Sequence, residues 1–572
     1  MAGFSPAGTF PATFDFVASR RNDTVLSAPF GTFATLFLIS GSIPHVVLVP
    51  RGSFMNPSGR LSGVLLPLFS LRARSDFGIG DFGSVEGLFA WLQLSGQRLW
   101  MLLPLLPTSP GDPSPYSTCC AFGLNPLFID LNPLINRYEL RLSDAEKHSL
   151  AEARRSPVVR YDLVVPLKGA LLARAFEAFE KNPDKAFETF CAAKRAWLDE
   201  YALFAAISED EQLRPWWDWK GGLAERAPAA LQAARTRLKR AVRFQQWAQW
   251  VADTQWMHVR TQATAHGVLV CGDEPFIIGQ NSSDVWCHPG LLRRDARLGV
   301  PPDDFAVDGQ DWGLPWFDFA AMEIEQYQWL KFRAVQAAGY YDLRRVDHAV
   351  GYFRQYLRDE ATPRGRFVPD VEATQAALGE KNFRLLSSAA PAPAGLPSAI
   401  IAEDLGVIPK FVRVVLDALQ LPGYKVMRWA REDGVYQDPH QYPAVSLVTT
   451  GTHDSETLRE WWTVSLPWER EAVCRVFPEL NAFQPPPGEF TPALHEALLR
   501  AALNASSALC VLPWQDVFAE AERTNLPGTV SDSNWVYRIK PEAEELSSRE
   551  DTARTAKWLK GLTVEGTRST AA

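Results

Sequence analysis

The chain has 572 residues, of which 47% are hydrophobic and 22% are charged, and its formal net charge is −8. This length allows about two to four ordinary domains or one barrel with insertions, and the negative charge gives no reason to expect nucleic acid or an anionic membrane as a partner. Seven cysteines, an odd number with no CxxC pair, argue against a disulfide framework and a zinc site, and they fit a reducing, cytoplasmic compartment.

Residues 1–54 differ in composition from the rest of the chain, being rich in Phe, Ser, Gly and Pro. Residues 30–49 carry no formal charge, and this stretch of 20 residues meets the crude length of a membrane helix. Two glycines and a proline interrupt it, so we prefer an irregular extension, disordered or not native, to a membrane anchor. We expect the catalytic region at 55–550 and a tail at 551–572.

Eight short apolar runs, separated by helical patterns, follow from Gly63 onward. Strands alternating with helices in this number predict a (β/α)8 (TIM) barrel. The predicted strands are 63–71, 99–106, 268–276, 341–348, 400–406, 423–429, 446–454 and 509–516. The clearest predicted helices are 84–94, with Ser84 as N-cap, then 322–336 and 409–416.

Two long segments between these strands predict insertions into the barrel. Residues of about 107–267 show helical spacing and are too many for a simple connection, which predicts a largely helical inserted subdomain. Residues of about 277–320 are rich in loops, and a long loop in a compact domain is usually a functional lid. Gln310 and Trp312 there offer a hydrogen bond and a stacking face, although a loop packed by its own aromatics is an equal alternative.

The glycines at 78, 80 and 83 match the G-x-G-x-x-G pattern of dinucleotide-binding folds. That fold needs a strand running directly into the first glycine and an acidic residue about 20 positions further on. Here residues 72–77 intervene, and the next strand ends in Pro107-Thr108. We therefore set the nicotinamide-binding hypothesis aside.

Four predicted strands end in a carboxylate: Asp273, Asp347, Glu403 and Asp454. In a barrel of this type the strand C-termini hold the active site, so these acids should converge. Strand alternation places Arg345 on the same face as Asp347, where its charge would keep that acid ionised. A purely structural ion pair is the alternative for this segment alone.

Converging carboxylates, aromatic loops and no metal-ligand cluster suit cleavage of a glycosidic bond. This reaction needs one ionised carboxylate and one protonated acid on either side of the bond. The apolar run before Glu403 should raise its pKa and keep a proton for the leaving oxygen. Asp454 would be a third group that binds the sugar, and His348 and His453, each beside an acid, could hold sugar hydroxyls.

These residues lie in motifs that resemble the 4-α-glucanotransferases, also called amylomaltases or disproportionating enzymes (glycoside hydrolase family seventy-seven). The resemblance runs from about Arg60 to about Arg538. The matching motifs are 77–83, 114–117, 272–273, 283–286, 299–305, 309–315, 341–348, 402–406, 422–423, 450–454 and 525–535.

The resemblance implies a retaining barrel enzyme that moves a glucan segment between 4-hydroxyls of 1,4-α-glucans and maltooligosaccharides. It implies Asp347 as nucleophile, Glu403 as acid/base and Asp454 as transition-state stabiliser. The implied sugar contacts are Arg345, His348, His453 and Asp273 at the bond-breaking subsite, with Tyr116, Gln310, Trp312 and Asp433 for the donor, the acceptor or the lid. It also implies no required metal or organic cofactor and a cytosolic location.

Two other functions stay open at this point, namely an α-glucan hydrolase of the α-amylase group and a non-catalytic glucan-binding protein. The three acids do not separate a transferase from a hydrolase, because both use them. The chain also departs from the family pattern at Met101, Leu314 and Ser455-Glu456, none of which is one of the three acids.

Overall fold

The computed structural model describes residues 59–301, 309–358, 365–568 and 570. The predicted extension at 1–54, with its candidate membrane segment, lies outside these residues. Within the described part of the chain, no helix is long and apolar enough to cross a membrane.

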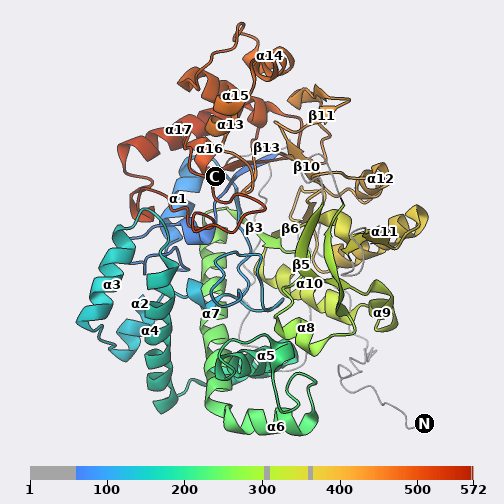
Figure 1. The fold of residues 1–572 in the computed structure, drawn as a ribbon. Coiled ribbons are helices and arrows are strands. Elements are labelled where there is room, and N and C mark those ends of the chain that lie inside the picture. The colour runs from blue at the N-terminus through green and yellow to red at the C-terminus, as the bar shows by residue number, and fades with distance from the viewer. Residues whose placement is uncertain (1–58, 302–308, 359–364, 569, 571–572) are drawn as a thin grey trace, which may run out of the picture. The chain divides into compact units, whose positions relative to one another are not determined.

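Eight parallel strands close into a barrel at the centre of residues 54–572 (Figure 1). In order around the barrel they are β1 (Leu61–Leu65), β14 (Leu509–Pro513), β13 (Ser446–Thr449), β10 (Gly423–Val426), β9 (Ile400–Ala402), β6 (Leu343–Val346), β3 (Leu269–Glu274) and β2 (Leu99–Met101). The predicted (β/α)8 barrel is thus confirmed, and each strand overlaps one of the eight predicted runs.

Most strands are shorter than their apolar runs. The run that contains β1 continues to residue 71 in sequence, but Pro67 lacks the N–H that a ladder needs, and residues Leu68–Ser70 form a 3-10 helix instead. Pro104 follows β2 in the same way. The remaining apolar residues are still buried, because they pack beneath the loops at the barrel ends.

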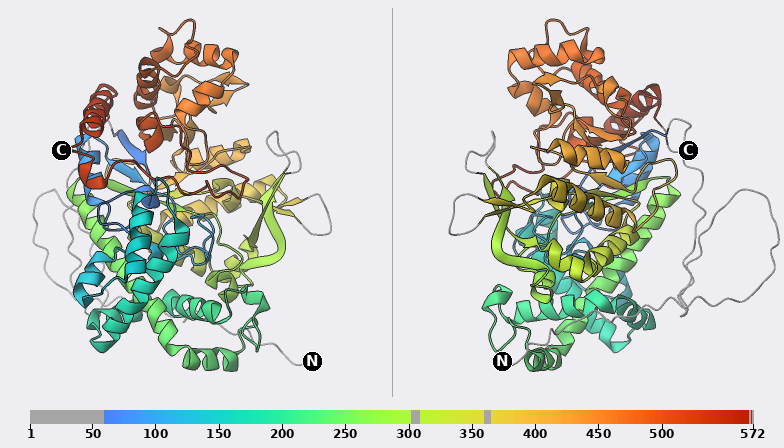
Figure 2. Two further views of the ribbon diagram at one scale, coloured as in Figure 1. Left: turned by 60° about the vertical axis from the view of Figure 1, so that its left-hand side comes forward. Right: turned by 90° about the vertical axis from the view of Figure 1, so that its right-hand side faces the viewer.

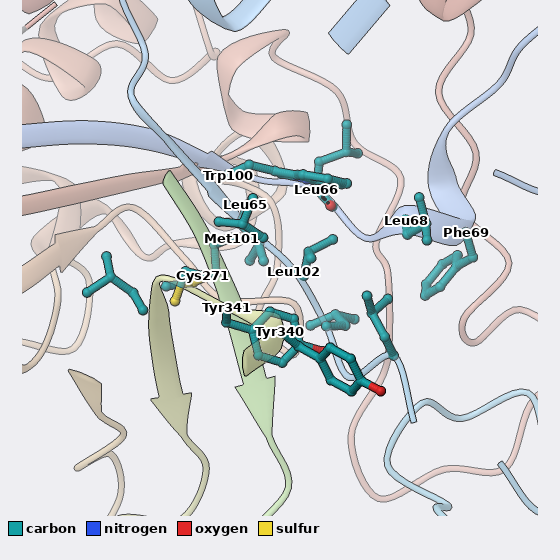
Figure 3. Close-up of a cluster of buried hydrophobic side chains, with 14 of the residues drawn as sticks. Leu65, Leu66, Leu68, Phe69, Trp100, Met101, Leu102, Cys271, Tyr340 and Tyr341 are labelled. Atoms are coloured by element: carbon teal, nitrogen blue, oxygen red, sulfur yellow. Dashed lines mark hydrogen bonds between the residues drawn. The ribbon is translucent and has the colours of Figure 1, made fainter. Parts of the chain in front are cut away.

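Most strand residues are apolar on both faces, as expected for parallel strands covered by helices, and the charged residues of β3 and β6 form ion pairs with each other. Trp100 of β2 faces outward, where its ring lies 5.6 Å from that of Phe89 in α1 (Glu86–Leu94) and its indole N–H donates to the Leu66 carbonyl at 2.8 Å. Its neighbour Met101 faces inward, and its side chain and that of Arg345 line one small cavity inside the barrel. Figure 3 shows Trp100 and Met101 in one buried cluster with Tyr340 and Tyr341, which lie just before β6 in the chain.

Long helices fill the segment between β2 and β3, where the helical insertion was predicted. They are α2 (Asn132–Tyr138), α3 (Asp144–Arg155), α4 (Tyr161–Lys181), α5 (Lys185–Asp210), α6 (Pro228–Arg237) and α7 (Lys239–Ala265). Aromatic residues join α4, α5 and α7, with Phe179 lying 5.3 Å from Phe187 and 6.0 Å from Trp247 between ring centroids. Helix α7 then runs along the barrel into β3 (Figures 1 and 2).

The segment at about 277–320, predicted to be a loop-rich lid, contains more regular structure than its sequence indicated. It contains α8 (Ser283–Cys287) and an antiparallel hairpin of β4 (Leu292–Val300) and β5 (Gln310–Phe317). With β7 (Gln355–Arg358) and β8 (Arg366–Val368) this hairpin forms a four-stranded sheet in the order β5-β4-β7-β8. Gly313, with a φ of +61°, and register shifts in the β4–β5 ladder break the alternation that would have identified the strands.

Two helices differ from their predicted ranges, 84–94 and 322–336. Helix α1 starts at Glu86, and Ser84 does not cap it but donates its hydroxyl to Asp81 Oδ1 at 2.9 Å. The predicted helix 322–336 is two helices, α9 (Phe319–Ile324) and α10 (Gln328–Tyr340). They are separated because Gln326 and Tyr327 adopt left-handed backbone angles, which end a right-handed helix.

Seven more α-helices follow β8 among residues 365–568. They are α11 (Glu372–Ser387), α12 (Lys410–Ala418), α13 (Leu458–Val464), α14 (Pro467–Val476), α15 (Pro492–Asn504), α16 (Trp514–Val517) and α17 (Glu550–Glu565). The expected tail therefore holds a helix, α17, which packs on α1. The indole N–H of Trp91 donates to the Thr552 carbonyl at 3.1 Å across this contact.

The glycines of the G-x-G-x-x-G pattern serve close packing. A Cβ on Gly80 would lie 2.0 Å from the Leu68 carbonyl oxygen, and one on Gly83 would lie 2.4 Å from Asp130 Oδ2. The first glycine follows a 3-10 helix and a turn, so no strand runs into it. The arrangement lacks the strand–turn–helix geometry of a dinucleotide site.

Candidate active site

A cleft of about 1340 Å³ opens at the C-terminal ends of the barrel strands. Its floor holds the three acids Asp347, Glu403 and Asp454. One wall is β5, through Gln310, Trp312 and Leu314. The other walls are loop residues within 110–117, 158–160 and 525–536, together with the first two residues of α4, Tyr161 and Asp162.

Strand register brings Arg345 to the centre of the acids. In the β3–β6 ladder Asp273 is the direct partner of Arg345, and in the β6–β9 ladder Val346 is the partner of Ala402. Asp347 and Glu403 each follow these paired residues by one position, so they leave the barrel side by side. Directly opposed residues in a parallel sheet point to the same face, which explains why the charged side chains meet.

The Arg345 guanidinium touches two carboxylates closely and approaches a third. Its Nη1 lies 2.8 Å from both oxygens of Asp273 and 2.9 Å from Asp347 Oδ1. Its Nη2 lies 3.9 Å from Glu403 Oε2. The predicted pairing of Arg345 with Asp347 is present, and Asp273, fully buried beneath the cleft floor, balances the arginine from below.

Backbone hydrogen bonds hold the carboxyl group of Glu403 at the cleft floor. It accepts hydrogen bonds from the backbone N–H groups of His348 at 2.8 Å and Leu405 at 2.9 Å. Burial raises its pKa to about 7, against the opposing charge of Arg345, and the nearby charge of Asp347 adds to the increase. The predicted direction of this pKa shift is therefore confirmed, and a pKa near neutrality lets the group both give and take a proton.

Asp454 lies in the loop after β13, five residues beyond its last residue, and its side chain is 42% exposed. Its Oδ2 lies 3.2 Å from His453 Nε2. Desolvation acts to raise its pKa, but the charge of His453 and hydrogen bonds from His453 and Asn525 lower the pKa to about 2. Conversely, desolvation acts to lower the pKa of His453, and the charge of Asp454 raises it.

Tyr116 connects the two halves of the site. Its hydroxyl donates to Asp273 Oδ2 at 2.7 Å and lies 3.0 Å from His453 Nε2, from which it can accept. Its ring stacks on the His453 ring, with centroids 5.3 Å apart and planes at 19°. Tyr116 therefore stands in the cleft as a fixed wall between Asp273 and the Asp454 loop.

His348 lies between the floor and the β5 wall. Its φ of +45° is left-handed, a strained angle for a residue with a side chain. The Trp312 ring meets its ring edge-on, with centroids 4.7 Å apart. Burial lowers the His348 pKa to about 4, so the imidazole is neutral at pH 7 and can accept or donate a hydrogen bond to a sugar hydroxyl.

Three predicted site residues are absent from the cleft lining, because Asp273 and Arg345 line a small cavity beneath its floor and Asp433 lies elsewhere. Strand β10 ends at Val426, and the chain then forms a small hairpin of β11 (Arg431–Glu432) and β12 (Val435–Tyr436). Asp433 lies exposed in the turn of this hairpin and is absent from the cleft lining. The family resemblance implied a contact with the donor, the acceptor or the lid for Asp433, and the hairpin holds it outside the cleft lining.

The three departures from the family pattern have different surroundings. Leu314 lines the cleft on β5. Met101 lies below Arg345, where its sulfur is 3.5 Å from the Tyr424 hydroxyl. Ser455 is buried behind the Asp454 loop and accepts from the Thr452 N–H at 2.9 Å, so it does not face the cleft.

Two residues of the site received no individual role from the sequence. Asn525 donates to Asp454 Oδ1 at 2.6 Å, and Trp535 packs on both Tyr116 and His453 at centroid distances of 5.8 Å and 6.0 Å. Both come from the loop after β14. The position of that loop at a strand C-terminus was the available signal, since such loops build the site in this fold.

Among the described residues, no group of three or more His, Cys, Asp or Glu side chains is arranged to hold a metal ion.

Comparison with known proteins agrees with this architecture. The sequence model of the family described as 4-alpha-glucanotransferase matches residues 66–544. A 4-alpha-glucanotransferase of Thermus thermophilus is 33% identical over 502 residues, covering 84% of this chain and 95% of the relative. One of Chlamydia muridarum is 31% identical over 508 residues, covering 85% and 92%.

Solved structures give the same result. An amylomaltase from Streptococcus agalactiae in complex with acarbose superposes with a TM-score of 0.76 at 26% identity, covering 89% of this chain and all of that one. The amylomaltase of Corynebacterium glutamicum shares the fold with a TM-score of 0.71 at 22% identity, covering 87% of this chain and 75% of that one. From its sequence, its barrel and its cleft, this chain belongs to the 4-alpha-glucanotransferase family.

Proposed function

We propose that this protein carries out the glucan transfer of its family by a retaining double displacement, with Asp347 as nucleophile, Glu403 as acid/base and Asp454 as stabiliser of the transition state. Donor and acceptor are 1,4-α-glucans, including maltooligosaccharides. The observation that carries the proposal is the convergence of three acids from β6, β9 and β13 on one cleft, with Arg345 beside two of them.

In the first step, an Asp347 oxygen attacks the anomeric carbon while Glu403 gives its proton to the glycosidic oxygen. The C–O bond to the leaving chain breaks, and the donor sugar stays on Asp347 as an ester. The raised pKa of Glu403 supports its role as the acid, and the contact of Arg345 with Asp347 supports an oriented nucleophile.

In the second step, Glu403 takes the proton of an acceptor 4-hydroxyl, whose oxygen attacks the same carbon and releases Asp347. Two inversions give net retention of the α-linkage. Positive charge develops on the sugar ring in both steps, and Asp454 faces it as an ionised carboxylate.

Transfer rather than hydrolysis requires that a sugar hydroxyl reaches the ester before water does. The β4–β5 hairpin supports this preference, because Gln310, Trp312 and Leu314 wall the cleft next to His348. Gln310 accepts from the Trp312 indole N–H at 3.0 Å, which fixes the ring position.

We also infer a cytoplasmic location, supported by seven cysteines that are all free of disulfides.

Incubation with maltotriose tests the function. We expect glucose and a ladder of longer maltooligosaccharides, while the concentration of total reducing ends stays constant. Rising reducing ends with shorter products alone would instead establish a hydrolase, and unchanged maltotriose would establish a binding protein.

A further inference from the structure

Asp454 has one hydrogen-bond donor for each of its carboxylate oxygens, and the two donors come from different loops. His453 Nε2 faces Oδ2 at 3.2 Å, and Asn525 Nδ2 donates to Oδ1 at 2.6 Å. We propose that Asn525 is a positioning residue, which fixes the plane of the Asp454 carboxylate toward the sugar ring. The proposal rests on the role of Asp454 in the proposed function.

The Asp454 backbone is anchored without Asn525. Its N–H donates to Thr452 Oγ1 at 3.2 Å, and its carbonyl accepts from Arg523 Nη2 at 3.2 Å. The loop base is held as well, because buried Asp516 accepts from Thr450 Oγ1 at 2.6 Å and from the Leu458 N–H at 2.6 Å. Loss of the Asn525 amide therefore frees rotation of one half-exposed carboxylate and leaves the loop in place.

Asn525 is itself positioned before any substrate arrives. It is 8% exposed, and both of its flanks are tied down. Upstream, Thr524 accepts from the Trp535 N–H at 2.8 Å and from Gln515 Nε2 at 2.9 Å. Downstream, the buried Asn534 side chain accepts from the Leu526 N–H at 3.1 Å and donates to the Thr529 carbonyl at 3.0 Å.

The chemistry of an amide suits this place. Asn525 supplies an N–H donor with no charge, so it orients Asp454 without neutralising it. An aspartate of the same shape would be a donor only while it holds a proton, because two adjacent carboxylates repel each other and share one proton. The substitution N525D therefore keeps the shape of the side chain but changes its capacity to donate a hydrogen bond.

The test compares N525A, N525D and the wild type in maltotriose transfer, with N481A as a control at an exposed asparagine outside the cleft. We expect N525A to lower kcat by roughly 10- to 100-fold, the effect of losing one hydrogen bond to a charged group, with a change in apparent KM of less than about threefold. We expect N481A to match the wild type.

The activity of each variant relative to the wild type is also measured as a function of pH. A purely structural role of Asn525 would not make this relative activity depend on pH. Activity of N525D relative to the wild type should rise toward acidic pH, as its carboxyl gains the proton it needs to donate to Asp454. The relative activity of N525A should not. N525A activity within about twofold of the wild type, or parallel relative profiles for the two variants, would overturn the proposal.

The wild-type product ladder is measured in the same experiment. Its absence would overturn the proposed function, whereas a normal ladder with undiminished N525A would overturn only the role of Asn525. Thermal unfolding of N525D, which keeps the shape of the side chain, separates loss of function from loss of fold.

Discussion

Two sides of the cleft floor hold the same chemical group in opposite states. On the β6–β9 side, the Glu403 side chain is 11% exposed and its pKa is raised to about 7, mainly by burial. On the β13–β14 side, the Asp454 side chain is 42% exposed, and although desolvation acts to raise its pKa, its partners lower it to about 2. The raised pKa favours a protonated Glu403 near neutral pH, and the lowered pKa favours an ionised Asp454.

The difference comes from the neighbours that each fold element supplies. Among the described residues, Glu403 accepts hydrogen bonds from two backbone N–H groups, and the nearby cation Arg345 is closer to Asp273 and Asp347. Asp454 instead has a histidine and an amide of its own. In the proposed mechanism, the surroundings of each acid thus decide which one donates a proton and which one stabilises charge, as in two-carboxylate glycosidases.

Asp347, the proposed nucleophile, lies between the two sides, and its replacement should have the largest effect. D347N turns the carboxylate into a neutral amide, a poor nucleophile, while the barrel core is unchanged, so we expect transfer to fall by about 10⁴-fold or more. Initial rates with maltotriose and thermal unfolding of the variant measure this. A well-folded D347N enzyme with substantial transfer would contradict the assignment.

The E403Q variant should remove proton donation and leave charge stabilisation by Asp454 unchanged. An amide cannot supply the proton, so we expect a loss of about 10²- to 10⁴-fold with maltotriose. With α-maltosyl fluoride, whose leaving group needs no proton, the first step should recover.

D454N is the matched variant for that experiment. D454N removes the negative charge that stabilises the sugar ring in the transition state, and this charge is needed whatever the leaving group is. The fluoride donor should therefore not restore the activity of D454N. Equal recovery of both variants would show that the two acids do not have the separate roles assigned to them.

The pH dependence sharpens the same contrast. Glu403 must be protonated for the first step, so a pKa raised to about 7 predicts that the rate of this step falls above pH 7, by about tenfold per pH unit. Asp454 must be ionised, and a pKa lowered to about 2 predicts that it causes no loss between pH 4 and 7. Rates at low donor and saturating acceptor concentration, which report the first step, test both limbs from pH 4 to 9. A rate that already falls as the pH rises above 5 would contradict the raised pKa of Glu403.

The β5 wall should have a smaller effect, exerted on the acceptor step. W312A removes a ring that packs on His348, so we expect a decrease in transfer of about 2- to 10-fold and a larger fraction of hydrolysis. The ratio of new reducing ends to glucose released measures it. An unchanged ratio would show that the hairpin does not shield the ester from water.

The smallest effect is expected at Asp433. Because it is exposed on the β11–β12 hairpin and outside the cleft lining, D433N should change transfer by less than about twofold. Rates with maltotriose and with longer donors check this. A tenfold loss with longer donors alone would bring Asp433 back as a substrate contact.

The barrel and its acids were predictable because each depends on local sequence. An apolar run followed by a charged residue identifies both a strand and its C-terminal end, and Asp347 and Glu403 each follow their strands by one residue. The direction of the Glu403 pKa shift followed from its apolar neighbours.

Features that depend on distant contacts were not predictable. Asn525 acts on a residue 71 positions earlier in the chain, and no local pattern encodes that meeting. The hairpin strand β5 was hidden by Gly313 and by irregular register, and the position of Asp433 outside the cleft lining depends on the short hairpin that follows β10.

The protonation contrast between Glu403 and Asp454 is tested most directly by a pH titration of the carboxylic-acid C=O stretch in infrared difference spectra. The wild type is compared with E403Q and with D454N. We predict that the E403Q difference shows a carboxyl group that loses its proton with a midpoint near pH 7, and that the D454N difference shows none above pH 4. A midpoint near pH 4.5 for Glu403, or a protonated Asp454 at pH 6, would contradict the account.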